Sequence, residues 1–372
     1  MDRLLRTLNE AIQQARIARE LPFLRAERAA LLARFGELEA ARQEVTQLRA
    51  LPETADNGVL HAWLWLAESL IDFHQDLGDR ARDRVRRAMA LARSVRAPRI
   101  QALAAAWLAH MEFRDQQDVA AVEHARQALL LSGPEHHGAR ARASIVIAGM
   151  YQFAGREDLS QPWYALARTH AIKEGDSSAL TSIAYNLALL RVIAVRLSAV
   201  FGTANSLALK RARLGTESSA SLDQSVRNRA LNHHPPIQRA QILVAHGEHE
   251  AALVLYDAHL QEAMAQGLKS SECLYEADRA LCLLELGRSD DALAAARRAD
   301  SAFIVATELE EQAVAHAELA EVFGRVGLPD VSRRHQEAAQ DCHDRLQQRW
   351  NRLLDACEAA QLGQFLRVEV PG

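Results

Sequence analysis

A pattern of alanine and glycine recurs every forty residues in the C-terminal half of this 372-residue chain. Its three clearest copies surround Gly247, Gly287 and Gly327, with an alanine seven residues before each glycine and an alanine or serine five residues after it. Glycine readily adopts the left-handed conformation that ends a helix, and small residues beside the turn let two helices pack closely. The pattern therefore predicts helical hairpins, each made of two antiparallel helices.

The same pattern extends towards the N-terminus. Copies surround Gly36 and Gly155, a weaker copy surrounds Gly78, and another has Gln116 in place of the glycine. A degenerate copy has Arg191 at that position. Repeats of this kind predict a stack in which each hairpin buries its apolar face against its neighbours.

Composition favours an all-α fold. The chain has only 17 glycines and 9 prolines, and aromatic residues make up 5% of it, so helix formers outweigh the residues that strands prefer. The longest stretch without a charged residue that we find, residues 177–190, has 14 residues, whereas a membrane-spanning helix needs about 20. The first 20 residues lack the apolar core of a secretory signal.

The four cysteines are not spaced for disulfides or for a paired-cysteine metal site. Cys273 and Cys282 would lie on opposite sides of one helix, and Cys342 and Cys357 would lie about 22 Å apart along another. A reducing compartment is the simplest reading, so we expect a cytoplasmic protein. The formal net charge of −4 gives no overall attraction to nucleic acid.

The spacing of small residue, glycine and alanine resembles the tetratricopeptide repeat (TPR), in its longer bacterial variant of about 40 residues. The resemblance covers residues 22–342. The early tryptophan of the 34-residue form is missing, and Arg239 and Arg279 stand where an apolar residue is expected, so other α-solenoids are the nearest alternative. The resemblance implies a right-handed α-solenoid of about eight helical hairpins. Similar long-period arrays serve bacterial regulators as sensor and docking modules.

The repeat positions divide the chain into five parts. Between Gly155 and Gly247 lie 92 residues, which is two periods plus a surplus rich in turn and loop residues. We therefore expect an N-terminal capping helix at 1–21, repeats 1–5 at 22–200, an insertion or loop region at 201–235, repeats 6–8 at 236–342, and a C-terminal capping helix with a tail at 343–372.

Histidines are the main candidates for chemistry. His335 and His343 would share a helix face but lie about 12 Å apart along it, too far to hold one metal ion. Cys342 and His343 would point about 100° apart on a helix, so they are not placed to act as nucleophile and base. No phosphate-binding glycine loop, HExxH motif or GxSxG motif occurs. The sequence predicts no catalytic residue, no metal site and no cofactor.

Two basic clusters are candidates for binding nucleic acid. Arg80, Arg84 and Arg87 form one helical stripe, and residues 210–213 contain three more basic side chains near the insertion. Neither cluster is interleaved with aromatic residues, and both are typical of solvated helix faces. The sequence therefore argues against a nucleic-acid partner.

The resemblance also implies a binding groove. In the resembling family, groove side chains lie 13, 10, 6, 3 and 2 residues before the glycine of each repeat. These positions are occupied here by Trp65, Glu68, Asp72, Gln75, Asp76, His110, Phe113, Arg114, Arg142, Ile145, Gln152, Gln241, Glu321 and Arg325. The groove would be polar and of mixed charge, which suits a peptide or helix with alternating charges.

We therefore expect a non-catalytic scaffold or regulatory module that binds a protein or peptide partner in its concave groove. The alternative is a sensor, in which a small molecule or signalling peptide binds between repeats and the insertion at 201–235 acts as a movable flap. A helical enzyme, the third class, would need an enclosed pocket with converging titratable groups. The sequence leaves the oligomeric state open.

Overall fold

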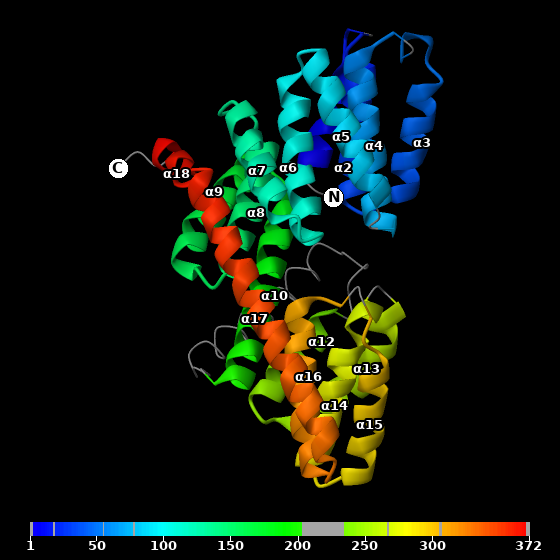
Figure 1. Cartoon of the computed structure of the whole chain (residues 1–372). Helices are drawn as coiled ribbons and strands as arrows, with labels where there is room; N and C mark the ends of the chain where they lie inside the picture. Colours follow the sequence, from blue (N-terminus) through cyan, green and yellow to red (C-terminus); the bar gives the residue numbers. More distant parts are fainter. Residues whose placement is uncertain are drawn as a thin grey trace. The chain divides into compact units, whose positions relative to one another are not determined.

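The computed structural model describes residues 3–17, 19–54, 56–76, 79–202, 234–265, 268–304 and 307–369. Throughout these residues the chain is helical and contains no β-strand, which confirms the predicted all-α class. It divides into two compact units (Figure 1). Residues 1–183 and 352–372 form the first unit, and residues 184–351 form the second.

The first unit consists mainly of four helical hairpins preceded by a single helix. In each hairpin two consecutive helices pack against each other, and the first helix of the next hairpin packs against one or both of them. The helices are α1 (Arg3–Gln14), α2 (Leu21–Arg34), α3 (Leu38–Arg49), α4 (Gly58–Asp76), α5 (Asp79–Ser94), α6 (Pro98–Arg114), α7 (Asp118–Leu131), α8 (His137–Phe153) and α9 (Glu157–Glu174), with a short 3-10 helix η1 (Pro52–Thr54) and a last helix α18 (Gly363–Glu369) against α9.

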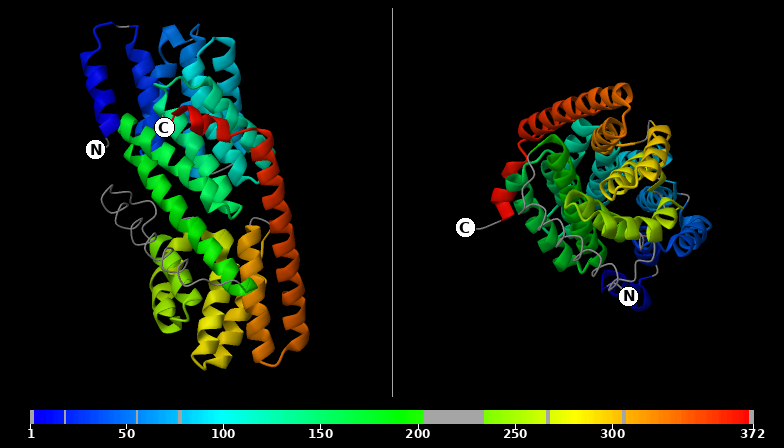
Figure 2. Two further views of the ribbon diagram at one scale, coloured as in Figure 1. Left: turned by 90° about the vertical axis from the view of Figure 1, so that its left-hand side faces the viewer. Right: turned by 90° about the horizontal axis from the view of Figure 1, so that it is seen from below.

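The second unit repeats the same construction, and its antiparallel pairs are visible from the further sides drawn in Figure 2. Its elements are α12 (His234–Ala245), α13 (His249–Ala265), the 3-10 helix η3 (Leu268–Ser271), α14 (Glu272–Glu285), α15 (Ser289–Ser301) and α16 (Leu309–Arg325). Two long helices belong to both units: α10 (Ser177–Phe201) begins in the first, and α17 (Pro329–Ala359) begins in the second.

The turns form where the repeat predicts them. Gly287 has a φ of 76° and ends α14, and the following N–H of Arg288 donates to the carbonyl of Leu283 at 2.9 Å. Gln116, in the repeat without a glycine, takes the same left-handed conformation with a φ of 59°. The turn expected at Arg191 does not form, because α10 runs through it with no glycine or proline to stop the helix.

The structure can be compared with two of the predicted divisions of the chain, the start of the C-terminal capping helix and the insertion. The boundary expected between residues 342 and 343 falls inside α17, which is continuous from Pro329 to Ala359. The expected insertion at 201–235 lies outside the described residues except for its first two and last two positions.

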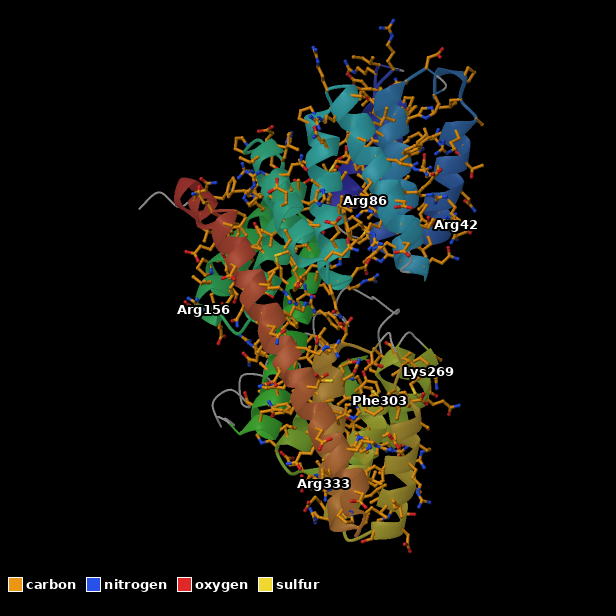
Figure 3. The ribbon with its side chains drawn as sticks, in the orientation of Figure 1. Arg42, Arg86, Arg156, Lys269, Phe303 and Arg333 are labelled. Carbon is orange, nitrogen blue, oxygen red and sulfur yellow. The ribbon has the colours of Figure 1, made fainter. Side chains whose placement is uncertain are left out.

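Alanine is the main packing residue between helices. Ala292, Ala295 and Ala299 of α15 have no exposed surface, so their stripe lies entirely against neighbouring helices. Small side chains at a crossing let helix axes approach to about 8–10 Å. Charged side chains such as Arg156 and Arg333 lie at the surface (Figure 3).

Helix α10 is the one helix in the described part of the chain that is long and apolar enough to cross a membrane, by length and composition. Its second half carries Arg196, which is 3% exposed and forms ion pairs with Asp278 and Glu318. A buried arginine paired with two carboxylates of the same unit is a feature of a protein core. This half of α10 is therefore a core helix of the second unit.

Candidate functional site: the inner face of the first unit

The repeat in α4 is displaced by two residues from the position that the sequence predicts. The Ser69 hydroxyl of α4 donates to the carbonyl of Ala81, twelve residues on, at 2.8 Å. The pair with the same spacing in the last repeat makes the reverse contact, in which the Ser332 hydroxyl donates back to the carbonyl of Ala320 at 2.6 Å. Ser69 is therefore the small residue of this repeat, in place of Ile71. A shift of two residues turns a helix by about 200°, so the predicted α4 residues face the opposite way.

Two of the predicted α4 residues face α5, the other helix of their own hairpin. Trp65 lies beneath Arg87, whose guanidinium carbon is 5.6 Å from the centre of the indole ring. Asp72 is 6% exposed and forms ion pairs with Arg84 at 2.7 Å and Arg80 at 3.1 Å. These side chains hold the hairpin together and do not line a groove.

The remaining predicted α4 residues with described side chains face α3. Glu68 forms an ion pair with Arg49 at 2.7 Å, and Gln75 accepts a hydrogen bond from Arg42 at 2.6 Å. The side chain of Asp76 lies outside the described residues. The prediction for α4 was thus wrong in register, and Trp63, Leu70, Phe73 and His74 take the inward positions instead.

A cavity of about 360 Å³ lies on the side of the first unit where α2, α4, α6 and α8 meet. All four helices, which are the first helices of their hairpins, contribute to it, and α1 adds Leu4 and Leu8. The wall combines apolar side chains with five charged ones, Glu27, Arg34, Arg99, Glu135 and Glu174. It is lined by Leu4, Leu8, Glu27, Ala30, Leu31, Arg34, Trp63, Leu70, Arg99, Leu103, Glu135, His136, Gly138, Ala139 and Glu174.

The Trp107 ring is contacted by two arginines, Arg142 and Arg34. The Arg142 guanidinium lies over the Trp107 indole, with 4.1 Å between its central carbon and the ring centre. Arg34, which lines the cavity, lies 6.0 Å from the same ring. Arg142 is only 7% exposed, and burial together with the neighbouring Arg34 lowers its pKa to about 9, although Asp176 acts in the opposite direction.

Aromatic side chains surround Trp107. Phe73, His74 and His110 have ring centres 5.9, 6.2 and 5.7 Å from it. His74 reaches solvent, but the surrounding protein still removes enough water to lower its pKa to about 4, and Arg142 and Arg34 add to this effect. Burial and Arg142 also lower the pKa of His110 well below its usual value. Both histidines are therefore neutral at neutral pH.

We call this surface the inner face and define it by the cavity-lining residues of α2, α4, α6 and α8 together with Phe73, His74, Trp107, His110 and Arg142. Four other predicted residues lie on α6 and α8 beside it. Arg114 lies over Phe73 at 5.2 Å, and Phe113 contacts Phe153 with 5.9 Å between ring centres. Ile145 and Gln152 are buried on the same helix face as Arg142 by their spacing.

The three groove residues predicted in the second unit, Gln241, Glu321 and Arg325, do not line a common open groove. Gln241 is buried, and its backbone carbonyl accepts a hydrogen bond from Arg196 of α10 at 3.2 Å. Glu321 and Arg325 are exposed, lie 3.2 Å apart and share an ion-pair cluster with Glu285. Because Arg196 also reaches α14 and α16, the chain's own α10 occupies this side of α12, α14 and α16.

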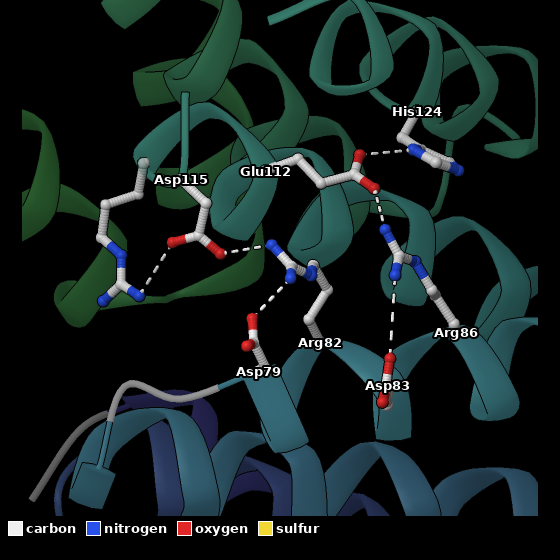
Figure 4. A network of polar contacts seen from close by, with 8 residues as sticks. Asp79, Arg82, Asp83, Arg86, Glu112, Asp115 and His124 are labelled. Atoms are coloured by element: carbon white, nitrogen blue, oxygen red, sulfur yellow. Dashed lines mark hydrogen bonds and ion pairs between the residues drawn. The ribbon is translucent and has the colours of Figure 1, made fainter. Parts of the chain in front are cut away.

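Arg80, Arg82, Arg84 and Arg86 of α5 form ion pairs within the chain, and Arg87 lies over Trp65, so the stripe of Arg80, Arg84 and Arg87 is not a free basic patch. Arg82 binds Asp115 at 2.7 Å, and Arg86 binds Glu112 at 3.0 Å, so α5 is tied to the end of α6 (Figure 4). Glu112 also contacts His124 of α7 at 2.6 Å. The second basic cluster lies outside the described residues.

The candidate histidines have ordinary structural contacts. His335 contacts His316 through their Nδ1 atoms at 2.9 Å, and His343 stacks on Phe201 with 4.1 Å between ring centres. No group of three or more potential metal ligands occurs among the residues that the structure describes.

Sequence reasoning missed His74, Trp107 and Arg34 as inner-face residues. Ser69 and Ala81, spaced as in the other repeats, carried the signal that would have corrected the register in α4. Nothing in the local sequence around Arg34 indicates its partner, because Asp176 is 142 residues away.

Solved structures of other proteins have a fold similar to that of this chain. No protein-family model matches the sequence, and no curated protein matches it either. A Rap protein complexed with Competence and Sporulation Factor matches with a TM-score of 0.58 at 14% identity, over 93% of this chain and 98% of that one. The Rap conjugation gene regulator of the plasmid pLS20, in complex with the Phr* peptide, matches with a TM-score of 0.54 at 15% identity, over 93% and 95%. This chain therefore has the TPR-like helical-repeat fold of these regulators.

Proposed function

We propose that this protein is a non-catalytic regulatory module of the long-period bacterial TPR type, and that it binds a peptide or an extended protein segment on its inner face. The observation that carries the proposal is the combination, in the first unit, of a cavity with apolar and charged walls, a cluster of aromatic rings and a nearly buried arginine. Aromatic and arginine side chains dominate binding energy at protein interfaces. Two proteins of similar fold are solved in complexes with Competence and Sporulation Factor and with the Phr* peptide.

The first unit is the better candidate because its cavity is the larger. The cavity between α10, α12, α14 and α16 measures about 140 Å³, against about 360 Å³ for the inner face. Ligand pockets usually measure about 300–1,000 Å³. We propose a cytoplasmic location and no nucleic-acid or membrane partner.

The second candidate function is sensing of a small molecule. The 360 Å³ cavity is large enough for one, and its mixture of apolar walls with a few charged groups is typical of such sites. The flap expected at 201–235 lies outside the described residues, so this candidate depends on the cavity alone.

Peptide selection with matched variants tests the first proposal. Peptides selected from a random library on the wild-type protein should bind His74→Ala at least about fivefold more weakly, because a contact on the inner face is lost. Gln75→Ala is the control, since Gln75 adjoins His74 in sequence but faces α3. Equal affinities for the two variants would exclude the inner face as the binding surface.

A further inference from the structure

The cavity of about 140 Å³ in the second unit is large enough for a small molecule. Apolar and aromatic side chains make up most of its wall, among them Val192 of α10 and the tyrosines Tyr185 and Tyr275. A cavity of about 150 Å³ with apolar walls holds a molecule the size of benzene. This cavity therefore suits a ligand of that size, which is much smaller than a peptide.

Two carboxylates in the first turn of α16 line this cavity without a cationic partner. Glu310 is 8% exposed, and its Oε2 atom is buried without a hydrogen-bond donor. Glu311 is partly buried and accepts a hydrogen bond from the Ser271 hydroxyl at 2.9 Å. Neither carboxylate forms an ion pair with any residue that the structure describes. Buried charges are normally paired, so this pair of carboxylates is unusual.

The arginines near these two carboxylates do not compensate them. Arg196 is the only cationic side chain among the described lining residues, and it already forms ion pairs with two other carboxylates. Burial and Glu308 raise the pKa of Glu310 to about 7, although Arg349 acts in the opposite direction. Burial and the neighbouring Glu310 raise the pKa of Glu311 to about 8. The chain itself therefore supplies too little positive charge at this wall.

A third acceptor lines the cavity from α12. Gln238 is 4% exposed, and its Oε1 atom is buried without a donor among the described residues. Such unsatisfied buried groups are uncommon in folded proteins. A water molecule can donate to Gln238 and Glu310, but it brings no positive charge. No group of three potential metal ligands occurs among the described residues, so a metal ion does not account for the site either.

We infer that this cavity binds a small molecule with a primary ammonium group and a short apolar chain. The ammonium brings one positive charge and three N–H donors, and the wall offers it the acceptors of Glu310, Glu311 and Gln238. The apolar chain would lie against the aliphatic side chains, and tyrosine rings attract a cation placed over their faces. This site belongs to the second unit and goes beyond the proposed function, which concerns the inner face of the first unit.

Three probes test this inference by ligand-observed NMR titration at pH 8, where Glu310 is largely ionised. Isoamylamine, which is about the size of benzene, should bind at millimolar concentrations. Isoamyl alcohol, which has the same shape without the charge, should bind about tenfold more weakly or not at all. Equal binding of the amine and the alcohol, or no binding of the amine, overturns the inference. An ammonium group can also come from a lysine side chain, and tighter binding of Nα-acetyl-lysine methylamide than of isoamylamine overturns the assignment to a free amine.

Matched variants locate the amine in this cavity. Glu310→Gln and Gln238→Leu should each reduce isoamylamine binding about tenfold, because each removes an interaction with the ammonium group. Glu337→Gln, on an exposed carboxylate of α17, should leave the binding unchanged. Both cavity variants should keep a Tm at or above that of the wild type at pH 8, because each removes a buried polar atom without a partner. If Glu310→Gln fails to fold, Gln238→Leu alone decides. Wild-type affinity in the folded variants would place the amine elsewhere and overturn the inference.

Discussion

Arg34, the last residue of α2, forms an ion pair with Asp176, which precedes α10 and lies 142 residues further along the chain. The two side chains are 10% and 1% exposed. Asp176 also accepts a hydrogen bond from the N–H of Ala179 at 2.9 Å, so it caps the start of α10. Although burial opposes its ionisation, Arg34, Ala179 and Arg142 together hold the pKa of Asp176 below its usual value. One carboxylate thus fastens the first hairpin to the helix that leaves the first unit.

Removing either side chain of the ion pair between Arg34 and Asp176 should destabilise the folded protein. Arg34→Met or Asp176→Asn is expected to lower the free energy of unfolding by about 3 kcal/mol, because one charge stays buried without its counter-ion. Urea unfolding followed by circular dichroism measures the loss. Arg156→Met, on an exposed ion pair, should cause no measurable change. A similarly small effect at Arg34 would mean that its ion pair is no stronger than one on the surface.

Replacing Arg196 should destabilise the protein more than replacing Arg34, since Arg196 forms ion pairs with two buried carboxylates. Arg196→Met leaves Asp278 and Glu318 buried together, and a loss of about 3–5 kcal/mol is expected. The loss should be smaller at pH 5 than at pH 8, because protonation relieves the repulsion between the carboxylates. Adding Glu318→Gln should recover part of the stability in urea unfolding, and no recovery would argue against electrostatic compensation as the role of Arg196.

Stability should depend on pH through Glu310 and Glu311 at the start of α16. Burial and neighbouring carboxylates raise their pKa values from 4.5 to about 7 and about 8. Between pH 4.5 and about 8 the folded state therefore holds more protons than the unfolded state. The two raised pKa values contribute stability that is fully present below pH 4.5 and is lost as the pH rises to about 8. Glu311→Gln should raise the Tm relative to the wild type above pH 8 and have less effect below pH 4.5. Glu337→Gln, on an exposed side chain of α17, is the control and should change the Tm little at either pH.

Two turn residues with positive φ, Arg96 and Gly287, predict stability changes of opposite sign when they are substituted. Arg96 has a φ of 55°, so Arg96→Gly should stabilise the protein by about 1 kcal/mol, because a residue with a Cβ is strained there. Gly287 has a φ of 76° with no atom near the position of an added Cβ, so Gly287→Ala should destabilise by about 1 kcal/mol through backbone strain alone. Thermal unfolding of both variants checks the signs, and effects in the same direction would contradict this account.

The helices and most turns could be predicted from the sequence because their signals are local. Gly247, Gly287 and Gly327 mark the ends of first helices, and even Gln116 was recognised by its spacing in the repeat. The turn expected at Arg191 was wrong because spacing alone, without a residue that stops a helix, does not end one.

The candidate site was less predictable. His110, Arg114 and Arg142 were named from the repeat, and the structure places them on or beside the inner face. The α4 residues were placed on the wrong side because a register error of two residues reverses a helix. Gln241 was placed in an open groove, although α10 of the same chain contacts it.

The sequence by itself determined a row of antiparallel helices, since helix length, turn position and small packing residues are each encoded within a few neighbouring positions. Only the tertiary structure decided which side of α4 faces inward and which arginines acquire counter-ions. Arg196 forms ion pairs with carboxylates 82 and 122 residues away, whereas Arg142 forms no ion pair with a carboxylate of the described residues, although Asp176 acts on its pKa. Charge compensation depends on distances in space, and folding brings together residues whose spacing along the chain carries no information about that encounter.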